Sequence, residues 1–166
     1  VNEDRKFHEL NQVNFSKSIP ATKIDNKLKG LKWITPPFKD NVEEEINFIK
    51  DLKSQIQTDK RKKMVITHYS FISSILDENF FSPSMAYTSD GSIIPLKNNK
   101  YSQKYKNLVI NLIKKNNVDV IYIVYPVHKG SISDYLDKSC LKEKLILKGV
   151  ISYEIKRCKD LIGKNN

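Results

Sequence analysis

Two histidines stand where a parallel β-sheet would present a binding site. His68 follows the apolar run 64–67 (MVIT), and His128 follows the run 118–125 (VDVIYIVY). In an open parallel sheet, ligands bind beyond the carboxyl ends of the strands. We therefore expect the two imidazoles at a common rim, where either can accept or donate a proton near neutral pH.

Further polar side chains accompany these histidines. Tyr69 and Ser70 follow the first, Lys129 follows the second, and a long loop between them carries Tyr87 and Asp90. Hydroxyl, ammonium and carboxylate groups converging on one rim favour binding of a polar ligand. The predicted substrate-binding residues are His68, Tyr69, Ser70, Tyr87, Asp90, His128 and Lys129.

No catalytic residue is assigned among them. Ser70 could act as a nucleophile only with a base and an orienting acid, for which His128 and Asp90 are the candidates. The simpler interpretation is a strand-to-helix turn in which Ser70 caps the following helix. Both interpretations stay open at the level of the sequence.

The elements that would position these residues alternate along the chain. Apolar residues spaced three and four apart predict helices over 41–57, 71–78 and 102–116. Short apolar runs predict strands over 31–35, 64–67 and 118–125. Residues 5–15 are a candidate opening strand. The alternating segment 150–156 (VISYEIK) indicates a half-exposed edge strand, antiparallel to its neighbour.

This order predicts an α/β fold with βαβ units. We expect a Rossmann-like three-layer sandwich with a mostly parallel sheet of about five strands and one antiparallel edge strand. Without repeats or a low-complexity linker, residues 1–166 are predicted to form a single α/β domain.

The formal charge of +10 argues only weakly for nucleic-acid binding. Of the 29 basic residues all but Arg5, Arg61 and Arg157 are lysine, and Asn and Ile are also abundant. Specific recognition of phosphates and bases relies on the planar guanidinium group of arginine. The excess charge is therefore attributed mainly to composition.

Cofactor and metal motifs are missing from the sequence. The five glycines are never clustered, which excludes a dinucleotide fingerprint and a P-loop. Neither H-E-x-x-H nor G-x-S-x-G occurs. No cofactor and no metal are predicted. Cys140 and Cys158 are either two separate buried thiols or one disulfide formed in an oxidising compartment.

The chain begins Val1-Asn2-Glu3, and its first methionine is Met64, which predicts a fragment of a longer protein. It contains no run of 18 apolar residues that could span a bilayer.

Three segments of the chain resemble a known family: LKGLKWITPPFKDNVEEEINFIKDLKSQI, KRKKMVITHYSFISSIL and NNVDVIYIVYP. Over about residues 5–157 they resemble the C-terminal soluble region of bacterial polytopic membrane glycosyltransferases, similar to the dolichyl-phosphate-mannose mannosyltransferases. The resemblance implies a lipid-linked sugar donor and a catalytic carboxylate in the first extracytoplasmic loop between transmembrane helices, a loop that is absent from this chain. It also implies a location on the periplasmic face of the inner membrane and accords with a Cys140–Cys158 bridge.

The resemblance assigns this chain a non-catalytic role in binding a glycan or lipid-linked acceptor, or in assembly with the rest of the parent protein. Two alternatives stay open. One is a free-standing small α/β enzyme that uses His68 and His128. The other is a basic nucleic-acid-binding domain, whose affinity would fall steeply with salt.

Overall fold

The computed structural model describes residues 15–34, 42–85, 87, 94–95 and 98–156. The chain forms two compact units, residues 1–59 and 60–166, and each is described by itself. The expectation of one domain over residues 1–166 stays a prediction. The candidate opening strand at 5–15 falls almost wholly outside the described residues.

A long amphipathic helix dominates the first unit. Helix α2 (Val42–Thr58) confirms the prediction over 41–57, and three glutamates occupy its first turn, at the positive end of the helix dipole. Its apolar stripe is buried, with Ile46, Ile49, Leu52 and Ile56 each at most 2% exposed. Three 3₁₀ turns also belong to this unit: η2 (Phe15–Lys17), η3 (Ala21–Lys23) and η4 (Asn26–Leu28).

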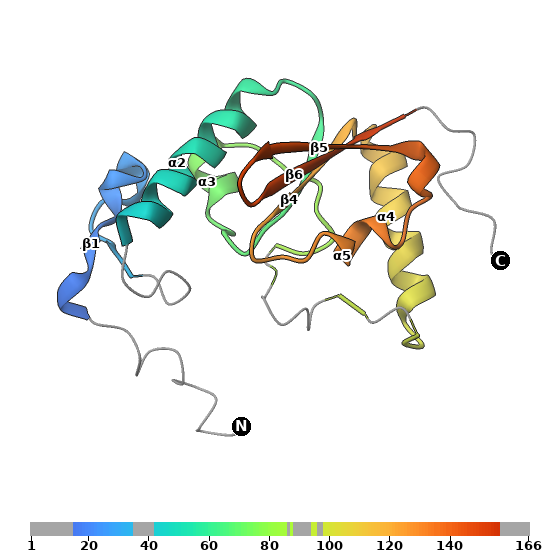
Figure 1. Ribbon diagram of the computed structural model, residues 1–166, viewed down its shortest axis with the longest axis horizontal. Helices are drawn as coiled ribbons and strands as arrows, with labels where there is room; N and C mark the ends of the chain where they lie inside the picture. The colour runs from blue at the N-terminus through green and yellow to red at the C-terminus, as the bar shows by residue number, and fades with distance from the viewer. Residues whose placement is uncertain (1–14, 35–41, 86, 88–93, 96–97, 157–166) are drawn as a thin grey trace. The chain divides into compact units, whose positions relative to one another are not determined.

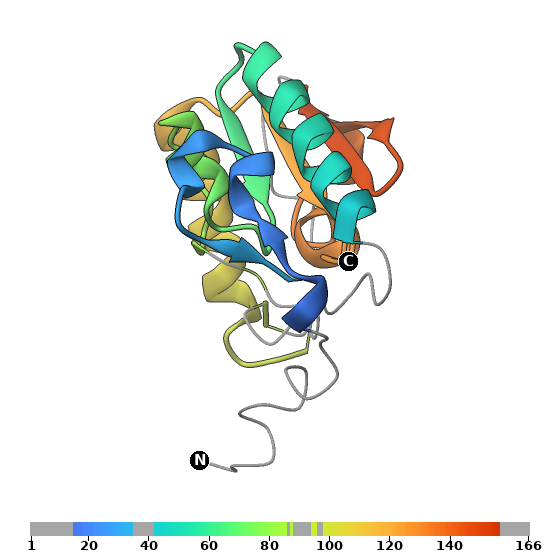
Figure 2. The ribbon, with the colours of Figure 1, turned by 90° about the vertical axis from the view of Figure 1, so that its left-hand side faces the viewer.

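The strand predicted over 31–35 does not join a central sheet. Strand β2 (Lys32–Trp33) pairs antiparallel with β1 (Ile19–Pro20) in a two-stranded sheet of its own (Figure 2). Exposed Lys32 interrupts the apolar run, and Leu31 is 61% exposed, so the run cannot be covered on both faces. The indole Nε1 of Trp33 donates to Oε2 of buried Glu45 at 2.9 Å, which supports a structural role for this tryptophan.

The second unit contains a four-stranded mixed sheet in the order β3-β4-β6-β5. Strands β3 (Lys63–Ile66) and β4 (Val120–Val124) pair in parallel, with Met64 beside Ile121 and Ile66 beside Ile123. Strands β6 (Val150–Ile155) and β5 (Leu141–Leu147) run antiparallel to their neighbours. Figure 1 shows β4, β6 and β5 side by side.

The predicted Rossmann-like, mostly parallel sheet of about five strands is therefore wrong. Only the β3–β4 pair is parallel in the described sheet, and the other two pairings are antiparallel. The connection after β4 explains the difference. A parallel crossover usually needs a full helix, but residues 125–140 supply only α5 (Gly130–Ser133) and η5 (Lys138–Cys140).

A hairpin that was not expected from the sequence completes the sheet. Strand β5 carries charges at three of its first four positions and lacks the expected alternation. Lys148 and Gly149 connect it to β6, and Gly149 adopts a φ of 88° that favours glycine. The predicted strand at 150–156 is real, but it lies inside the sheet rather than at its edge.

Helix α4 (Ser102–Asn116), predicted at the same bounds, packs on one face of this sheet. Its residues Val109, Ile110 and Ile113 share a core with Met64 of β3 and Ile121 of β4. The short helix α3 (Ile72–Leu76) lies within the range predicted over 71–78. Both faces of β4 are buried, as expected of an unbroken apolar strand.

Candidate functional site

The carboxyl ends of β3 and β4 lie at one edge of the sheet, because these two strands run in parallel. His68 and His128 follow these ends along the chain, two residues after β3 and four residues after β4. They do not form one pocket among the described residues. His128 lines a cavity near the β5–β6 hairpin, whereas a separate cavity beside α3 is lined by Tyr69 and Ser70.

A tight turn links β3 to α3. The Tyr69 amide donates to Oγ1 of Thr67 at 3.0 Å, and the Ser70 amide donates to the carbonyl of His68 at 2.9 Å. Phe71 is the N-cap of α3 and makes no side-chain capping bond. The capping role considered for Ser70 is thus not observed, and its hydroxyl belongs to the cavity wall instead.

That cavity, of about 400 Å³, is named here the β3–α3 cavity. Its walls combine hydroxyl groups, carboxylates, an amide and aromatic rings. The polar lining residues are Thr67, Ser70, Ser73, Ser74, Asp77, Glu78, Asn79, Ser82 and Ser84, and the others are Val65, Tyr69, Phe80, Phe81 and Met85. None of these described lining residues is basic.

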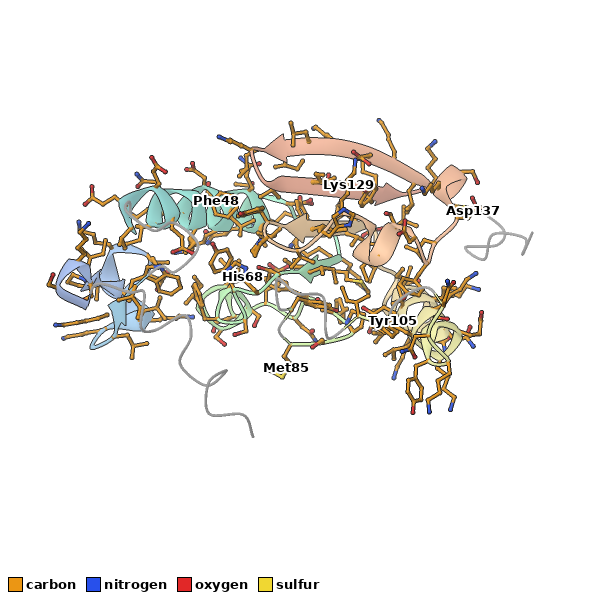
Figure 3. All side chains as sticks on the ribbon, turned by 60° about the horizontal axis from the view of Figure 1, so that its bottom comes forward. Phe48, His68, Met85, Tyr105, Lys129 and Asp137 are labelled. Carbon is orange, nitrogen blue, oxygen red and sulfur yellow. The ribbon has the colours of Figure 1, made fainter. Side chains whose placement is uncertain are left out.

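Four polar residues of this wall are spaced as on one face of a helix. Ser70, Ser73, Ser74 and Asp77 recur at intervals of three, one and three residues, opposite the buried Ile72 and Ile75. Such a polar stripe on a short helix is visible in the sequence, but only Ser70 of its members was predicted as a site residue. Figure 3 shows Met85, which is 91% exposed, projecting outward from the loop that completes the wall.

Ser82 attaches this loop to the outer edge of β3. Its hydroxyl donates to the Val65 carbonyl at 2.7 Å and accepts from the Val65 amide at 3.2 Å. The serine therefore replaces a neighbouring strand at one position of the sheet edge. These two hydrogen bonds hold the loop, and with it this part of the cavity wall, against the edge of the sheet.

A buried ion pair fixes one residue of the cavity wall, Glu78. The ammonium of Lys63, which is 2% exposed, contacts Oε1 of Glu78, whose side chain is 33% exposed. Burying an ammonium is costly unless a carboxylate neutralises it. Glu78 is thus held at the cavity by Lys63 and is not an independent surface charge.

His68 has the properties of a neutral, half-buried base. Its Nδ1 is buried and has no hydrogen-bond partner among the residues that the structure describes. Burial lowers the pKa of His68 from 6.5 to about 4, because the imidazolium form loses its hydration. Its ring stacks at 3.7 Å from the ring of Tyr69 with a tilt of 43°, and Figure 3 shows it beside α3.

The second cavity, named here the β5–β6 cavity, has a volume of about 270 Å³. His128 and Lys129 line it together with Glu143 of β5 and Tyr153 of β6, two residues that the sequence did not single out. The phenol of Tyr153 donates to Glu143 at 2.9 Å, and burial together with this carboxylate raises the pKa of that phenol. Lys129 and Glu143 pair loosely at 4.0 Å.

The remaining predicted residues are Tyr87, Asp90 and the two cysteines, and none of them is among the described residues that line these two cavities. Tyr87 is 2% exposed within the core, and burial raises its pKa well above the usual value of a phenol. Asp90 lies outside the described residues. Cys140 is disulfide-bonded, whereas Cys158, its predicted partner, is also outside them. The described residues contain no cluster of metal-binding side chains.

Neither the protein-family models nor the curated proteins nor the solved structures include a match to this chain. Among the described helices, none has the length and apolar character required to cross a bilayer. The function is therefore inferred from the geometry of the β3–α3 cavity and from the resemblance noted in the sequence.

Proposed function

We propose that the chain is an extracytoplasmic domain of a membrane glycosyltransferase that uses a lipid-linked sugar donor. The domain itself is non-catalytic and binds a glycan or the sugar part of a lipid-linked acceptor. The observation that carries this proposal is the composition of the β3–α3 cavity. Its hydroxyls, carboxylates, amide and aromatic rings suit a neutral polyhydroxylated ligand.

The polar groups of this cavity match the chemistry of sugars. A carboxylate such as that of Asp77 accepts hydrogen bonds from two neighbouring ligand hydroxyls, while serine hydroxyls both donate and accept. Tyr69, Phe80 and Phe81 contribute apolar ring surface, which suits the C–H faces of a sugar ring. No described lining residue is cationic, so the cavity is poorly suited to a phosphate group.

One further observation, together with the resemblance, supports the extracytoplasmic assignment. The disulfide of Cys140 is typical of an oxidising compartment. The resemblance predicts that, in the full-length protein, this domain follows a series of membrane-spanning helices. The alternative enzyme using both histidines has less support, because His68 and His128 do not line one cavity among the described residues.

The proposal is tested by titrating the isotope-labelled full chain with a panel of neutral mono- and oligosaccharides and following amide shifts by NMR. Binding should move resonances of α3 and of residues 77–85. Asp77→Asn removes one charged acceptor and should weaken binding about 10- to 100-fold, the range expected for a hydrogen bond to a charged group.

Asp134→Asn is the matched control, because it removes a carboxylate from the β5–β6 cavity. It should leave saccharide affinity unchanged. If Asp134→Asn weakens binding and Asp77→Asn does not, the site is in the wrong cavity. If no saccharide shifts any resonance of the β3–α3 cavity, glycan binding by this domain is refuted.

A further inference from the structure

Helix α4 and the residues before it carry positive charge without any carboxylate. Residues 91–118 contain no aspartate or glutamate, but they contain the lysines Lys97, Lys100, Lys104, Lys106, Lys114 and Lys115. Within the described part of the chain, none of the last five pairs with a carboxylate. Lys100, Lys104, Lys114 and Lys115 are exposed, so most of this charge faces solvent without a neutralising carboxylate.

The outward face of α4 combines this charge with exposed apolar side chains. Tyr101, Lys104, Leu108, Asn111 and Lys115 follow one another at intervals of three and four residues and are all exposed. They form one stripe, named here the α4 stripe, along a helix about 22 Å long. Tyr101 and Leu108 are 52% and 44% exposed, so both apolar side chains are available to a partner.

The opposite face of the helix is occupied by the core of its own unit. Val109, Ile110 and Ile113 are each at most 4% exposed, and the partly buried Tyr105 stacks edge-on against Tyr135 at 5.1 Å. In Figure 3, Tyr105 lies on the side of α4 that faces the sheet. The α4 stripe is thus held rigidly outward and is not needed for packing within the unit.

We propose that the α4 stripe docks the protein on an anionic membrane surface. Lysine ammoniums attract anionic headgroups without needing the bidentate geometry of arginine, and each contributes about 1 kcal/mol near a charged bilayer. Tyrosine and leucine between the lysines suit the interfacial layer, where an amphipathic ring lies at the headgroup level. Lys100 lies 5.0 Å from the ring centre of Tyr101, so cation and ring reach the surface together.

Charge complementarity requires an anionic partner, and the chemistry of the side chains favours a membrane over a nucleic acid. The only cations of the α4 stripe are lysines, and without arginine it lacks the planar donors that stack on bases and bind phosphates in bidentate geometry. The docking is expected to be weak and reversible, because apolar insertion is limited to two side chains. This inference is independent of the proposed glycan site, since it concerns a different surface and a different ligand.

The test is co-sedimentation of the full chain with vesicles. Binding is expected to vesicles of phosphatidylcholine mixed with phosphatidylglycerol, and not to vesicles of phosphatidylcholine alone. It should be lost when NaCl is raised from about 0.1 M to about 1 M, because the screening length falls from about 10 Å to about 3 Å.

Two matched double variants locate the surface. Lys104→Gln with Lys115→Gln should weaken binding about 30-fold, from the loss of two lysines at the bilayer. Lys144→Gln with Lys148→Gln removes the same charge from two exposed lysines in and next to β5, and it should leave binding unchanged. Leu108→Ser should weaken binding without altering the net charge. These side chains are exposed, and circular dichroism melts verify that each variant folds.

Several outcomes would overturn the proposal. Equal losses in the two double variants would reduce the effect to net charge. Equal binding to vesicles with and without phosphatidylglycerol would exclude the electrostatic mechanism. Tighter binding to a single-stranded RNA oligonucleotide, lost in the α4 double variant, would assign the stripe to nucleic acid.

Discussion

Replacing His68 by phenylalanine removes a group whose protonation should be coupled to folding between about pH 4 and pH 6.5. Burial lowers the pKa of His68 from 6.5 to about 4. Between these pH values the unfolded chain binds a proton that the folded chain does not. The free energy of unfolding should therefore fall as the pH drops from about 6.5 to about 4, and His68 should contribute nothing further below that range.

The size of this effect follows from the same values. A pKa lowered from 6.5 to about 4 would reduce the free energy of unfolding by about 3.4 kcal/mol in acid, if solvent screened none of the effect. Because the ring is only partly buried, water screens some of the penalty, and about 2 kcal/mol is the expected contribution. His68→Phe keeps an aromatic ring of similar size and should remove this pH-dependent loss.

The assay is urea unfolding followed by far-ultraviolet circular dichroism, repeated at several pH values between about 4 and 7. At pH 7 His68→Phe should be as stable as the unsubstituted chain or up to about 1 kcal/mol more stable, because it removes a buried nitrogen that has no described partner. His128→Gln removes an exposed imidazole and serves as the control for the loss of a histidine as such. A His68→Phe protein that retains the full pH dependence would refute the reasoning.

Three other predictions concern stability. Glu78→Gln should cost about 3 kcal/mol in chemical unfolding by leaving the Lys63 ammonium buried without its carboxylate, whereas Lys63→Met should be nearly neutral; equal effects would contradict this asymmetry. Ser82→Ala should cost about 1 to 3 kcal/mol and speed amide exchange at Val65, because it breaks both bonds to that strand edge; unchanged exchange would argue against it. Cys140 should resist alkylation in denaturant until a reductant is added, and reduction should lower stability by about 2 to 4 kcal/mol; immediate alkylation would show a free thiol.

The site was only partly predictable from the residues. Tyr69 and Ser70 line the β3–α3 cavity, and His128 and Lys129 line the β5–β6 cavity. Tyr87 was predicted at the binding rim, but its ring is buried in the core. A tyrosine in a loop without periodicity gives no sign of such burial. Glu143 and Tyr153 were missed because they come into contact through the β5–β6 hairpin, which pairs residues from two strands.

The sequence alone determined the local elements with strong periodicity. The stripe of α2, the bounds of α4 and the unbroken apolar run of β4 each follow from how side chains must be buried around a helix or a strand. It also determined that β3 and β4 lie parallel, because a helix long enough for a crossover lies between them.

Only the tertiary structure decided how the sheet is completed and which polar residues share a cavity. The charged sequence of β5 is compatible with a loop, and it becomes a strand because β6 supplies its hydrogen-bond partners. That hairpin completes the sheet with two antiparallel pairings, where the sequence had led us to expect mostly parallel ones. Strand pairing and cavity walls depend on contacts between residues far apart in the chain, and no periodicity within a segment encodes them.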